Sequence, residues 1–454
     1  MTNNVAMGAV ACLLGADFQI LASVIRDVFG NSKPELVNLN LRASRAGFDY
    51  LKKNFPAYRG RASASLKRRK ADRQLLLTGN DAIGLGAVAA GCQFFAAYPM
   101  TPINSMIGYF AARAKELGMV YYQPEDEIAG INAAIGASHG GARSMVATSG
   151  GGFSLMVEGF GLAGMTETPL VIIEGQRPGP STGLPTWTSQ SDLRFVLHAS
   201  QDDFPRIVLA PGDTQEAFWL TLEAFNLADR YQTPVVLLVD KYLCESHQSI
   251  KVFDETKIKI DRGLLMSIAE QQRDYQRYQI SDSGLSPRPI AGRSGMTFAA
   301  NSDEHDEFGF SEESAENRGA MMAKRMRKLE TLAREIPEPR VYLSEAKPRS
   351  KTEVILVGWG STKGSILEAQ KLLDQEGVSI GFLHLNYLNP LPTDSISRLF
   401  ASARKTLIVE QNYTAQLAGL LREKTGIEIE NKLLKYDGRP IFPEEIAERV
   451  KQMI

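Results

Sequence analysis

Three groups of residues with chemically active side chains follow short apolar segments of this 454-residue chain. They are Thr101 between two prolines in segment 98–102, the acids Glu125, Asp126 and Glu127, and the guanidinium of Arg177. A carboxylate can act as a general acid or base, and a guanidinium binds a carboxylate through two parallel hydrogen bonds. On the residues alone, however, acids are typical of the first turn of a helix, and Arg177 is typical of a surface loop.

The surrounding sequence predicts how these groups are positioned. Short apolar segments alternate with segments of helical periodicity, which is typical of a doubly wound parallel sheet in an α/β fold. Ligands bind at the carboxyl ends of the strands of such a sheet. Pro99 and Pro102 restrict the backbone, so we expect the Thr101 hydroxyl to be held rigidly at that edge. The expected strands are 75–77, 94–98, 144–148, 170–174, 206–209 and 234–240.

Helices are expected between these strands, and a second βα series follows them. Residues 81–90 and 128–140 have helical patterns, and Asp213 with Glu216 predicts a capping box at the start of another helix. Residues 17–29 and 41–55 near the N-terminus also read as helices. After a polar stretch comes a basic helix at 318–333. The second series has strands at 354–358, 378–385 and 406–410 and helices at 413–425 and 443–453.

The composition is that of a water-soluble protein. The chain is 44% hydrophobic and 23% charged with a formal net charge of −1, so it has no basic excess for binding nucleic acid or an anionic membrane. No apolar run is long enough to span a membrane, and no basic residue precedes the apolar segment 6–16, so we expect no signal peptide and a cytoplasmic location. Cys12, Cys92 and Cys244 are scattered and apolar-flanked, which favours buried core positions.

Other motifs favour structural roles. Residues 84–89 match an alanine-ended dinucleotide-binding fingerprint, but the next strand does not end in an acid, which favours glycines used for close packing. Histidines 139, 198, 247 and 384 are isolated. His305 lies among four acids in segment 303–307, where we expect a polar loop or an interdomain contact and no metal site. The chain has no P-loop and no Gly-Asp-Gly followed by Asn, a pattern that binds magnesium and diphosphate.

Four motifs follow one another in a specific order: the Tyr-Pro-Met-Thr-Pro segment 98–102, the Glu-Asp-Glu-Ile-Ala helix start at 125–129, the glycine turn at 148–152 and the arginine loop at 175–180. This order resembles the α subunit of 2-oxoacid:ferredoxin oxidoreductases, particularly the 2-oxoglutarate-type branch of the pyruvate:ferredoxin/flavodoxin oxidoreductase family. The resemblance implies that Glu127 is catalytic and contacts N1′ of the thiamine diphosphate aminopyrimidine. It implies that Thr101 and Arg177 bind the carboxylate of the 2-oxoacid, and that Pro99 and Ser149 line the cofactor pocket.

The same resemblance implies a domain organisation. Residues 1–60 are expected to be a helical remnant of a γ-type domain, 61–74 a basic linker and 75–250 the pyrimidine-type thiamine diphosphate domain. Residues 251–345 form a polar connecting region, and 346–454, with Glu410, Gln411 and Asn412, are similar to a transketolase C-terminal domain.

The resemblance further implies oxidative decarboxylation of a 2-oxoacid to an acyl-CoA, with coenzyme A as co-substrate and electrons passed to ferredoxin. A four-iron cluster normally needs four cysteines, so the iron–sulfur cluster and the Mg²⁺–diphosphate site are expected on a partner β subunit, in a two-fold (αβ)₂ assembly. One departure is Gln201, in a stretch where the family commonly has a histidine. The alternatives are therefore a noncatalytic assembly subunit or, from the fingerprint alone, a nicotinamide-dependent dehydrogenase.

Overall fold

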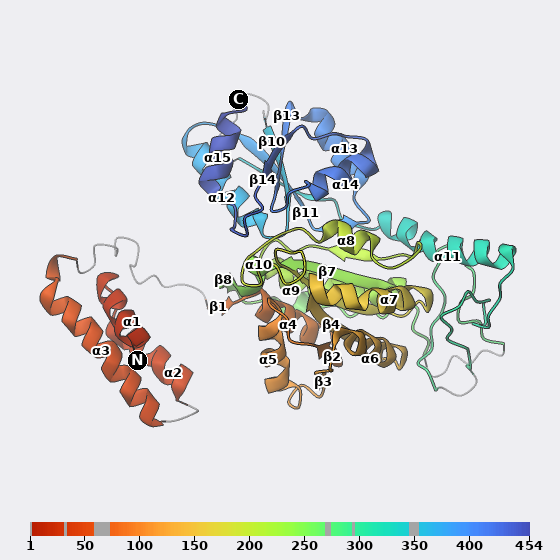
Figure 1. Ribbon diagram of the computed structural model, residues 1–454, viewed down its shortest axis with the longest axis horizontal. Helices are drawn as coiled ribbons and strands as arrows, with labels where there is room; N and C mark the ends of the chain where they lie inside the picture. Colours follow the sequence, from red (N-terminus) through yellow and green to blue (C-terminus); the bar gives the residue numbers. More distant parts are fainter. Residues whose placement is uncertain (1, 31–33, 59–72, 268–273, 293–295, 345–353) are drawn as a thin grey trace. The chain divides into compact units, whose positions relative to one another are not determined.

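The computed structural model describes residues 2–30, 34–58, 73–267, 274–292, 296–344 and 354–454 (Figure 1). The predicted basic linker at 61–74 lies almost entirely outside these residues. The chain divides into two compact units, Met1–Arg73 and Gln74–Ile454, which we describe separately.

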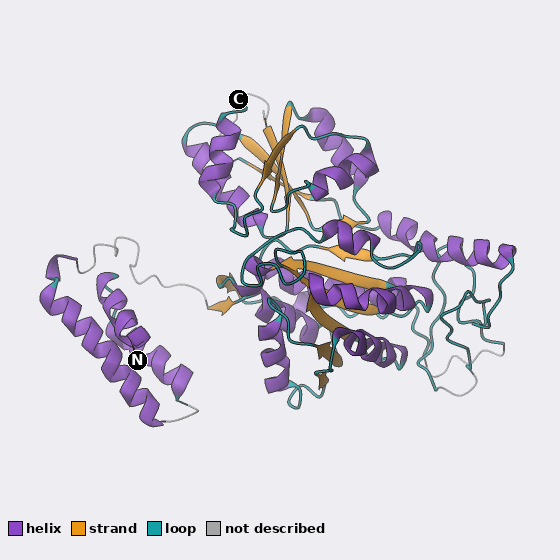
Figure 2. Ribbon diagram, viewed as in Figure 1, coloured by secondary structure: helices purple, strands orange, loops and turns teal. Residues whose placement is uncertain are grey.

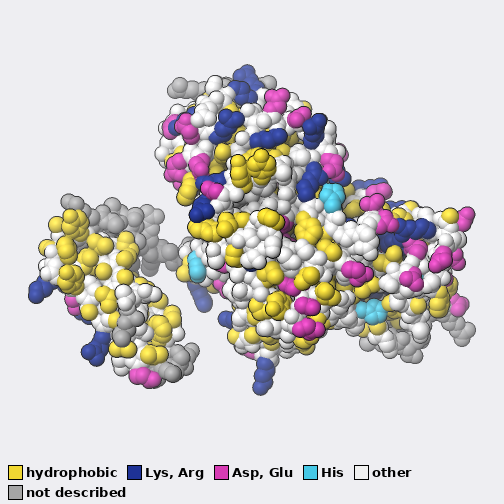
Figure 3. Space-filling model, viewed as in Figure 1, with side chains coloured by type: hydrophobic (Ala, Val, Ile, Leu, Met, Phe, Trp, Pro, Cys, Tyr) yellow, Lys and Arg dark blue, Asp and Glu magenta, His cyan; other side chains and the backbone are white. Residues whose placement is uncertain are grey.

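The first unit is helical, as residues 17–29 and 41–55 predict. It consists of α1 (Thr2–Leu13), α2 (Phe18–Phe29), α3 (Pro34–Asn54) and a short 3-10 helix, η1 (Pro56–Tyr58). Helices α1 and α3 approach closely at Gly8 and Gly47, where an added Cβ would collide with the facing backbone. Several large apolar side chains of this unit are exposed (Figure 3), among them Val10, Ile20, Val24 and Val28.

The second unit contains a seven-stranded sheet that positions the residues of interest. Its strand order is β12-β6-β7-β5-β4-β2-β3, and all neighbours are parallel except β12 and β6. Strands are orange in Figure 2, and β2, β3, β4 and β7 of this sheet are labelled in Figure 1. The strands are β2 (Phe94–Ala97), β3 (Val120–Tyr122), β4 (Ser144–Ser149), β5 (Leu170–Gln176), β6 (Ile207–Leu209), β7 (Pro234–Asp240) and β12 (Tyr387–Asn389). The α/β fold class and the parallel sheet are thus as predicted.

Helices cover both faces of this sheet, as a mostly parallel sheet requires. One buried cluster packs the sheet against α6, α7 and α8, and another packs it against α4, α5 and α9. The helices are α4 (Gly79–Ala89), α5 (Asn104–Arg113), α6 (Glu127–His139), α7 (Gly150–Met165), α8 (Leu193–His198), α9 (Thr214–Tyr231) and α10 (Lys241–Glu245).

The expectation that residues 75–77 begin the parallel sheet is wrong. Strand β1 (Gln74–Leu77) pairs antiparallel with β8 (Gln248–Lys251) in a separate two-stranded ladder. Its pattern of alternating exposure is typical of a half-exposed antiparallel strand, whereas β4, β5 and β7 are buried along their whole length.

The predicted capping box at Asp213 forms only in part. The Asp213 carboxylate accepts a hydrogen bond of 2.8 Å from the Glu216 backbone N–H, as predicted. The Glu216 carboxylate instead accepts from the Gly212 backbone at 2.8 Å, lies 2.5 Å from Lys363 Nζ and contacts His384 at 2.9 Å. Glu216 therefore joins the two α/β segments of this unit.

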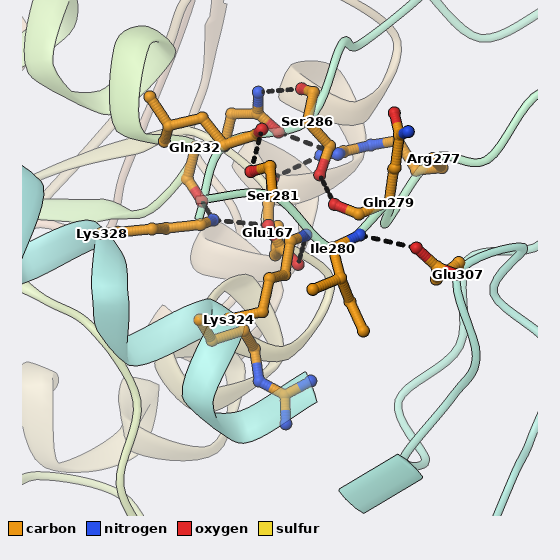
Figure 4. Close-up of polar contacts among 12 residues, drawn as sticks. Glu167, Gln232, Arg277, Gln279, Ile280, Ser281, Ser286, Glu307, Lys324 and Lys328 are labelled. Carbon is orange, nitrogen blue, oxygen red and sulfur yellow. Dashed lines mark hydrogen bonds and ion pairs between the residues drawn. The ribbon is translucent and has the colours of Figure 1, made fainter. Parts of the chain in front are cut away.

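The predicted polar stretch before residue 345 contains η3 (Glu255–Lys257), α11 (Ala315–Ala333) and β9 (Arg340–Leu343). Helix α11 is attached through an ionic cluster (Figure 4) around Glu167, which lies just after α7. Both Lys324 Nζ and Lys328 Nζ lie 2.6 Å from the Glu167 carboxylate, and all three side chains are buried. Arg277 donates to the Glu167 carbonyl oxygen at 2.8 Å.

The C-terminal segment forms a second sheet with the order β14-β13-β10-β11-β9, in which only β9 is antiparallel. Its other elements are β10 (Val354–Trp359), α12 (Thr362–Gln375), β11 (Ile380–Leu385), α13 (Thr393–Ser402), β13 (Lys405–Glu410), α14 (Gln416–Thr425), β14 (Asn431–Leu434) and α15 (Pro443–Lys451). Strand β12 leaves this segment and completes the edge of the seven-stranded sheet. Among the described helices, none combines the length and apolarity needed to cross a membrane.

Candidate functional site

The chemically active groups lie where β2, β4 and β5 end. In the sheet, Ala97 of β2 pairs with Ala147 of β4, and Ser149 of β4 pairs with Gly175 of β5. The segments that follow these strands are therefore neighbours at one edge of the sheet, which is the location predicted from the sequence.

Glu127 is the first residue of α6, and its position follows from the preceding acid. Asp126 has an extended backbone, and its carboxylate accepts a hydrogen bond of 2.8 Å from the Ala129 N–H, which caps the helix. Glu125 is exposed, whereas Glu127 is only 3% exposed. Of the three acids, Glu127 alone is buried.

The Glu127 carboxylate has an oxygen available for a ligand. Among the residues that the structure describes, none donates a hydrogen bond to its Oε1 atom. Burial raises the pKa of Glu127, and the neighbouring Asp126 carboxylate acts in the same direction. A carboxylate with raised proton affinity and an unused oxygen suits the sharing of a proton with a bound nitrogen base.

The glycine turn after β4 makes room for this carboxylate. A Cβ atom on Gly152 would collide with the Glu127 carboxylate and with Thr148 Oγ1, so no larger residue fits beside Glu127 without a shift. Ser149 precedes α7 but does not cap it through its side chain, and its buried hydroxyl has no hydrogen-bond partner among the described residues. The first turn of α7 thus covers Glu127 with backbone alone.

Arg177 and Thr101 lie in contact with each other, and the contact is made through the threonine backbone. Arg177 Nη1 donates a hydrogen bond of 3.0 Å to the Thr101 carbonyl oxygen. The Thr101 hydroxyl is 3.5 Å from the Asn104 side-chain amide. The Thr101–Pro102 peptide bond is cis.

The buried Asn80 also holds this segment, a role the sequence did not indicate. Asn80 Nδ2 donates to the Pro102 carbonyl oxygen at 2.8 Å and to Ser105 Oγ at 2.7 Å. Asn80 lies in the first turn of α4, where an amide is usually solvated, so only the tertiary structure reveals this contact.

A cavity of about 580 Å³ opens beside these residues. Its wall combines the arginine, an acid, small residues from the glycine turn and the Pro-Ser-Thr loop after β5. It is lined by Met100, Gly150, Gly151, Ser154, Arg177, Gly179, Pro180, Ser181, Thr182, Asp192 and Phe195. Of the residues chosen from the sequence, only Arg177 lines it. Pro99 is exposed, Thr101 is half-buried, and Glu127 and Ser149 are buried behind the glycine turn.

Sequence reasoning missed Asp192 and Glu174. Asp192 lies in the cavity wall, and the fully buried Glu174 in β5 lies beside it. Glu174 follows four apolar residues, so the sequence predicted only that it ends a strand. The sequence signal for a role of Glu174 in the site was its position three residues before Arg177.

The remaining motifs have packing roles. Gly84 and Gly86 lie within α4, where side chains would meet the Tyr109 ring and the Phe218 backbone, so this is not a dinucleotide-binding turn. His305 is buried, its Nδ1 is 3.0 Å from the Asp303 carbonyl oxygen, and its ring packs 4.2 Å from that of Tyr278. Across the described parts of the chain, no group of three or more His, Cys, Asp or Glu side chains is arranged to hold a metal ion.

Two family models match the chain. The one described as pyruvate flavodoxin/ferredoxin oxidoreductase, thiamine diP-bdg, matches residues 85–324, and the one described as transketolase, C-terminal domain, matches residues 345–426.

The chain is similar to relatives that cover most or all of its length. The subunit alpha of 2-oxoacid:ferredoxin oxidoreductase 1 from Aeropyrum pernix is 38% identical over 100% of this chain and 71% of its own length. The 2-oxoglutarate synthase subunit KorA from Methanothermobacter thermautotrophicus is 34% identical over 84% of this chain and 99% of its own length. A solved structure of 2-oxoglutarate:ferredoxin oxidoreductase from Magnetococcus marinus, with 2-oxoglutarate, coenzyme A and succinyl-CoA bound, has 34% identity and a TM-score of 0.86 over 99% of this chain and 77% of that one. With a matching family model and relatives above 30% identity over most of both chains, this chain belongs to the family of 2-oxoacid:ferredoxin oxidoreductase alpha subunits.

Proposed function

We propose that this chain is the α subunit of a thiamine diphosphate-dependent oxidoreductase that converts a 2-oxoacid and coenzyme A to an acyl-CoA and carbon dioxide and reduces ferredoxin. The observation that carries the proposal is the buried Glu127 carboxylate, whose Oε1 lacks a hydrogen-bond donor among the described residues. It lies behind the glycine turn that lines a cavity containing Arg177.

The residues present fit the aminopyrimidine end of thiamine diphosphate. A buried acid with a raised pKa can hold a proton against a ring nitrogen, and Glu127 offers one oxygen for that contact. Thiamine diphosphate supplies, when bound, the nucleophile that allows a 2-oxoacid to lose carbon dioxide. Glu127 then has the role of holding and returning a proton, with Pro99 and Ser149 close to the pocket.

Arg177 and Thr101 are proposed to bind the 2-oxoacid. The guanidinium is half-buried in the cavity wall, and one of its N–H groups is held by the Thr101 carbonyl oxygen. The remaining N–H groups can bind the substrate carboxylate. The Thr101 hydroxyl can act as a further donor, since a hydroxyl both donates and accepts.

The 2-oxoacid is proposed to be 2-oxoglutarate. The proposal is supported by the KorA subunit, a relative that the chain covers almost from end to end, and by the bound ligands of the Magnetococcus marinus enzyme. The subunit names of the relatives also support a partner β subunit, to which we assign the Mg²⁺–diphosphate site and the iron–sulfur cluster. An (αβ)₂ assembly and a cytoplasmic location complete the proposal.

Reconstitution tests the proposal. The purified chain should be colourless, should bind thiamine diphosphate weakly and should not reduce ferredoxin by itself. Mixed with its partner subunit, it should give 2-oxoglutarate- and coenzyme A-dependent reduction of ferredoxin, measured spectrophotometrically. A brown, iron-containing preparation of this chain alone that reduced ferredoxin would refute the proposed division of cofactors. An intact complex without turnover of any 2-oxoacid would instead favour the noncatalytic assembly subunit that Gln201 leaves open.

A further inference from the structure

The carboxyl group of Asp192 shares the cavity wall with Arg177. Asp192 precedes the short helix α8, yet its side chain does not cap that helix. Its backbone N–H donates to Gln176 Oε1 at 3.1 Å, which fixes the residue to the end of β5. The carboxyl group is therefore held in place by its backbone and remains available to the cavity.

Glu174 lies behind Asp192 in the middle strand β5, between β4 and β7, and is completely buried. Within the described residues, neither of its carboxyl oxygens has a hydrogen-bond partner. Its carboxyl neighbour is Asp192. A buried carboxylate without a donor is unfavourable, and a second carboxyl group beside it disfavours a second negative charge, so the pair favours holding one proton.

The surroundings decide which member holds the proton. Burial raises the pKa of Glu174 well above its usual range, and the Asp192 carboxylate reinforces this. Burial also raises the pKa of Asp192, to about 6, while the neighbouring Glu174 carboxyl group and the charge of Arg177 oppose the rise. Of the two, buried Glu174 favours the neutral form more strongly, and Asp192, which lines the cavity, is the member that exchanges protons with it.

The charged and titratable groups around the pair come from several elements. Arg177, after β5, is the cation that acts on Asp192. Glu174 acts on the buried Cys244 thiol of α10, as does Asp240 at the end of β7, and burial raises the pKa values of Asp240 and Cys244. The start of α7 faces Asp192 directly, because a Cβ on Gly150 would be 2.7 Å from Asp192 Oδ2.

We propose that the Glu174–Asp192 pair determines substrate binding by taking up one proton when an anionic 2-oxoacid enters the cavity. Protonated Asp192 then donates a hydrogen bond to a carboxylate oxygen of the ligand, beside the guanidinium of Arg177. The proton comes from solvent when the ligand binds and returns to solvent when the ligand leaves. This inference rests on the proposed function, because the ligand is the 2-oxoacid named there.

The direction of the pH dependence follows from this exchange. Ionised Asp192 repels a carboxylate and competes for Arg177, whereas protonated Asp192 attracts the carboxylate. The affinity for 2-oxoglutarate should therefore fall as pH rises above 6, by up to about tenfold per pH unit, because one proton is linked to binding.

The test uses the complex assembled with its partner subunit. The dissociation constant and the Michaelis constant for 2-oxoglutarate are measured on both sides of pH 6, and calorimetry in buffers of different ionisation enthalpy counts the protons taken up on binding. Asp192→Asn should abolish both the proton uptake and the fall in affinity. Glu174→Gln should retain both, because its amide donates to Asp192 in place of the protonated acid. The control Glu330→Gln, which removes an exposed acid from α11, should behave as the wild type.

Two results would overturn the inference. One is wild-type proton uptake and pH dependence in Asp192→Asn. The other is the absence, in the infrared spectrum of the wild-type chain at neutral pH, of a protonated-carboxyl band that Glu174→Gln removes. The infrared measurement needs no substrate, so it separates the two proposals. If the band is present but no 2-oxoacid binds, the protonation of Glu174 beside Asp192 is supported and the proposed function is refuted.

Discussion

Arg177 Nη1 donates a 3.0 Å hydrogen bond to the carbonyl oxygen of Thr101, which joins the loop after β5 to the turn after β2 across the edge of the sheet. One end of the guanidinium is thereby anchored to backbone. The orientation of its other N–H groups in the cavity follows from that anchor, since the guanidinium is planar and rigid.

We expect Arg177→Lys to weaken 2-oxoacid binding. Lysine keeps the charge but cannot hold the Thr101 carbonyl and present two parallel donors at the same time. The Michaelis constant for 2-oxoglutarate should rise by about tenfold or more, whereas the affinity for thiamine diphosphate in the assembled complex should stay the same. Steady-state kinetics and cofactor titration measure the two effects, and an unchanged Michaelis constant would return Arg177 to the role of a surface-loop residue.

Glu127→Gln should remove most turnover while the complex still assembles. General acid–base groups contribute on the order of 10²–10⁴-fold to a rate, and the amide cannot share a proton in the same way. Glu125→Gln is the matched control, because this neighbouring acid is exposed. Activity of the Glu127 variant close to that of the wild type would reject its catalytic role.

Gly152→Ala tests the position of Glu127 without altering its carboxyl group. The added methyl group must displace the Glu127 side chain or Thr148. Turnover and thiamine diphosphate affinity should both fall in the assembled complex. Gly136→Ala in α6 adds the same methyl group where no atom lies within 4 Å, so it should leave both quantities unchanged. Equal behaviour of the two variants would argue against a steric role for Gly152.

The ionic cluster in Figure 4 predicts a pH-dependent stability. Burial lowers the pKa of Lys328 to about 7, although Glu167 opposes the shift, whereas an unfolded lysine titrates near 10.4. Between these values the unfolded chain binds more protons, so the free energy of unfolding contributed by this group rises with pH, by up to about 1.4 kcal/mol per pH unit.

Lys328→Met should remove this rise, and chemical denaturation of the wild type and the variant at several pH values above 7 measures it. The exposed Lys371 of α12 provides the control variant Lys371→Met, which should keep the wild-type slope. Parallel slopes for the wild type and Lys328→Met would contradict the assignment.

For Glu167 the free energy of unfolding also rises with pH, but in the acidic range. Burial alone would raise its pKa, but the charges of Lys324, Lys328 and Arg277 outweigh burial and hold the pKa of Glu167 well below its usual range. Its contribution to stability is therefore present above the unfolded pKa near 4.3 and is lost as the solution becomes strongly acidic. Removing one partner from a buried ion pair costs about 3–5 kcal/mol, so Glu167→Gln should lower the free energy of unfolding at neutral pH by a similar amount, measured by denaturant titration.

The parts of the structure that could be predicted from the sequence are those specified by local patterns. Strands β5 and β7 begin with apolar runs and are buried along their length, and Asp126 and Glu127 have the residue types of a helix start. Strand β12 could not be predicted, because three residues carry no periodicity and its partner, β6, is remote in the sequence.

The burial of several charged residues also could not be predicted from local sequence patterns. Lys324 and Lys328 lie in a helix whose composition reads as basic and solvated, and their burial depends on Glu167, which is distant in the chain. Likewise Glu174 reads as a polar strand end, and only the neighbouring strands show that it is enclosed. Burial of a charged residue depends on the tertiary fold, and the pattern of neighbouring residues in the sequence does not predict it.

The short strand β12 means that the seven-stranded sheet is completed only after part of the C-terminal segment has been synthesised. Until Tyr387–Asn389 has been made, β6 is an open edge of three buried apolar residues whose backbone groups can pair with another chain. A fragment that ends before this strand would present that edge permanently and would be prone to aggregate. Strand β12 therefore protects the edge of the sheet that positions Glu127 and Arg177.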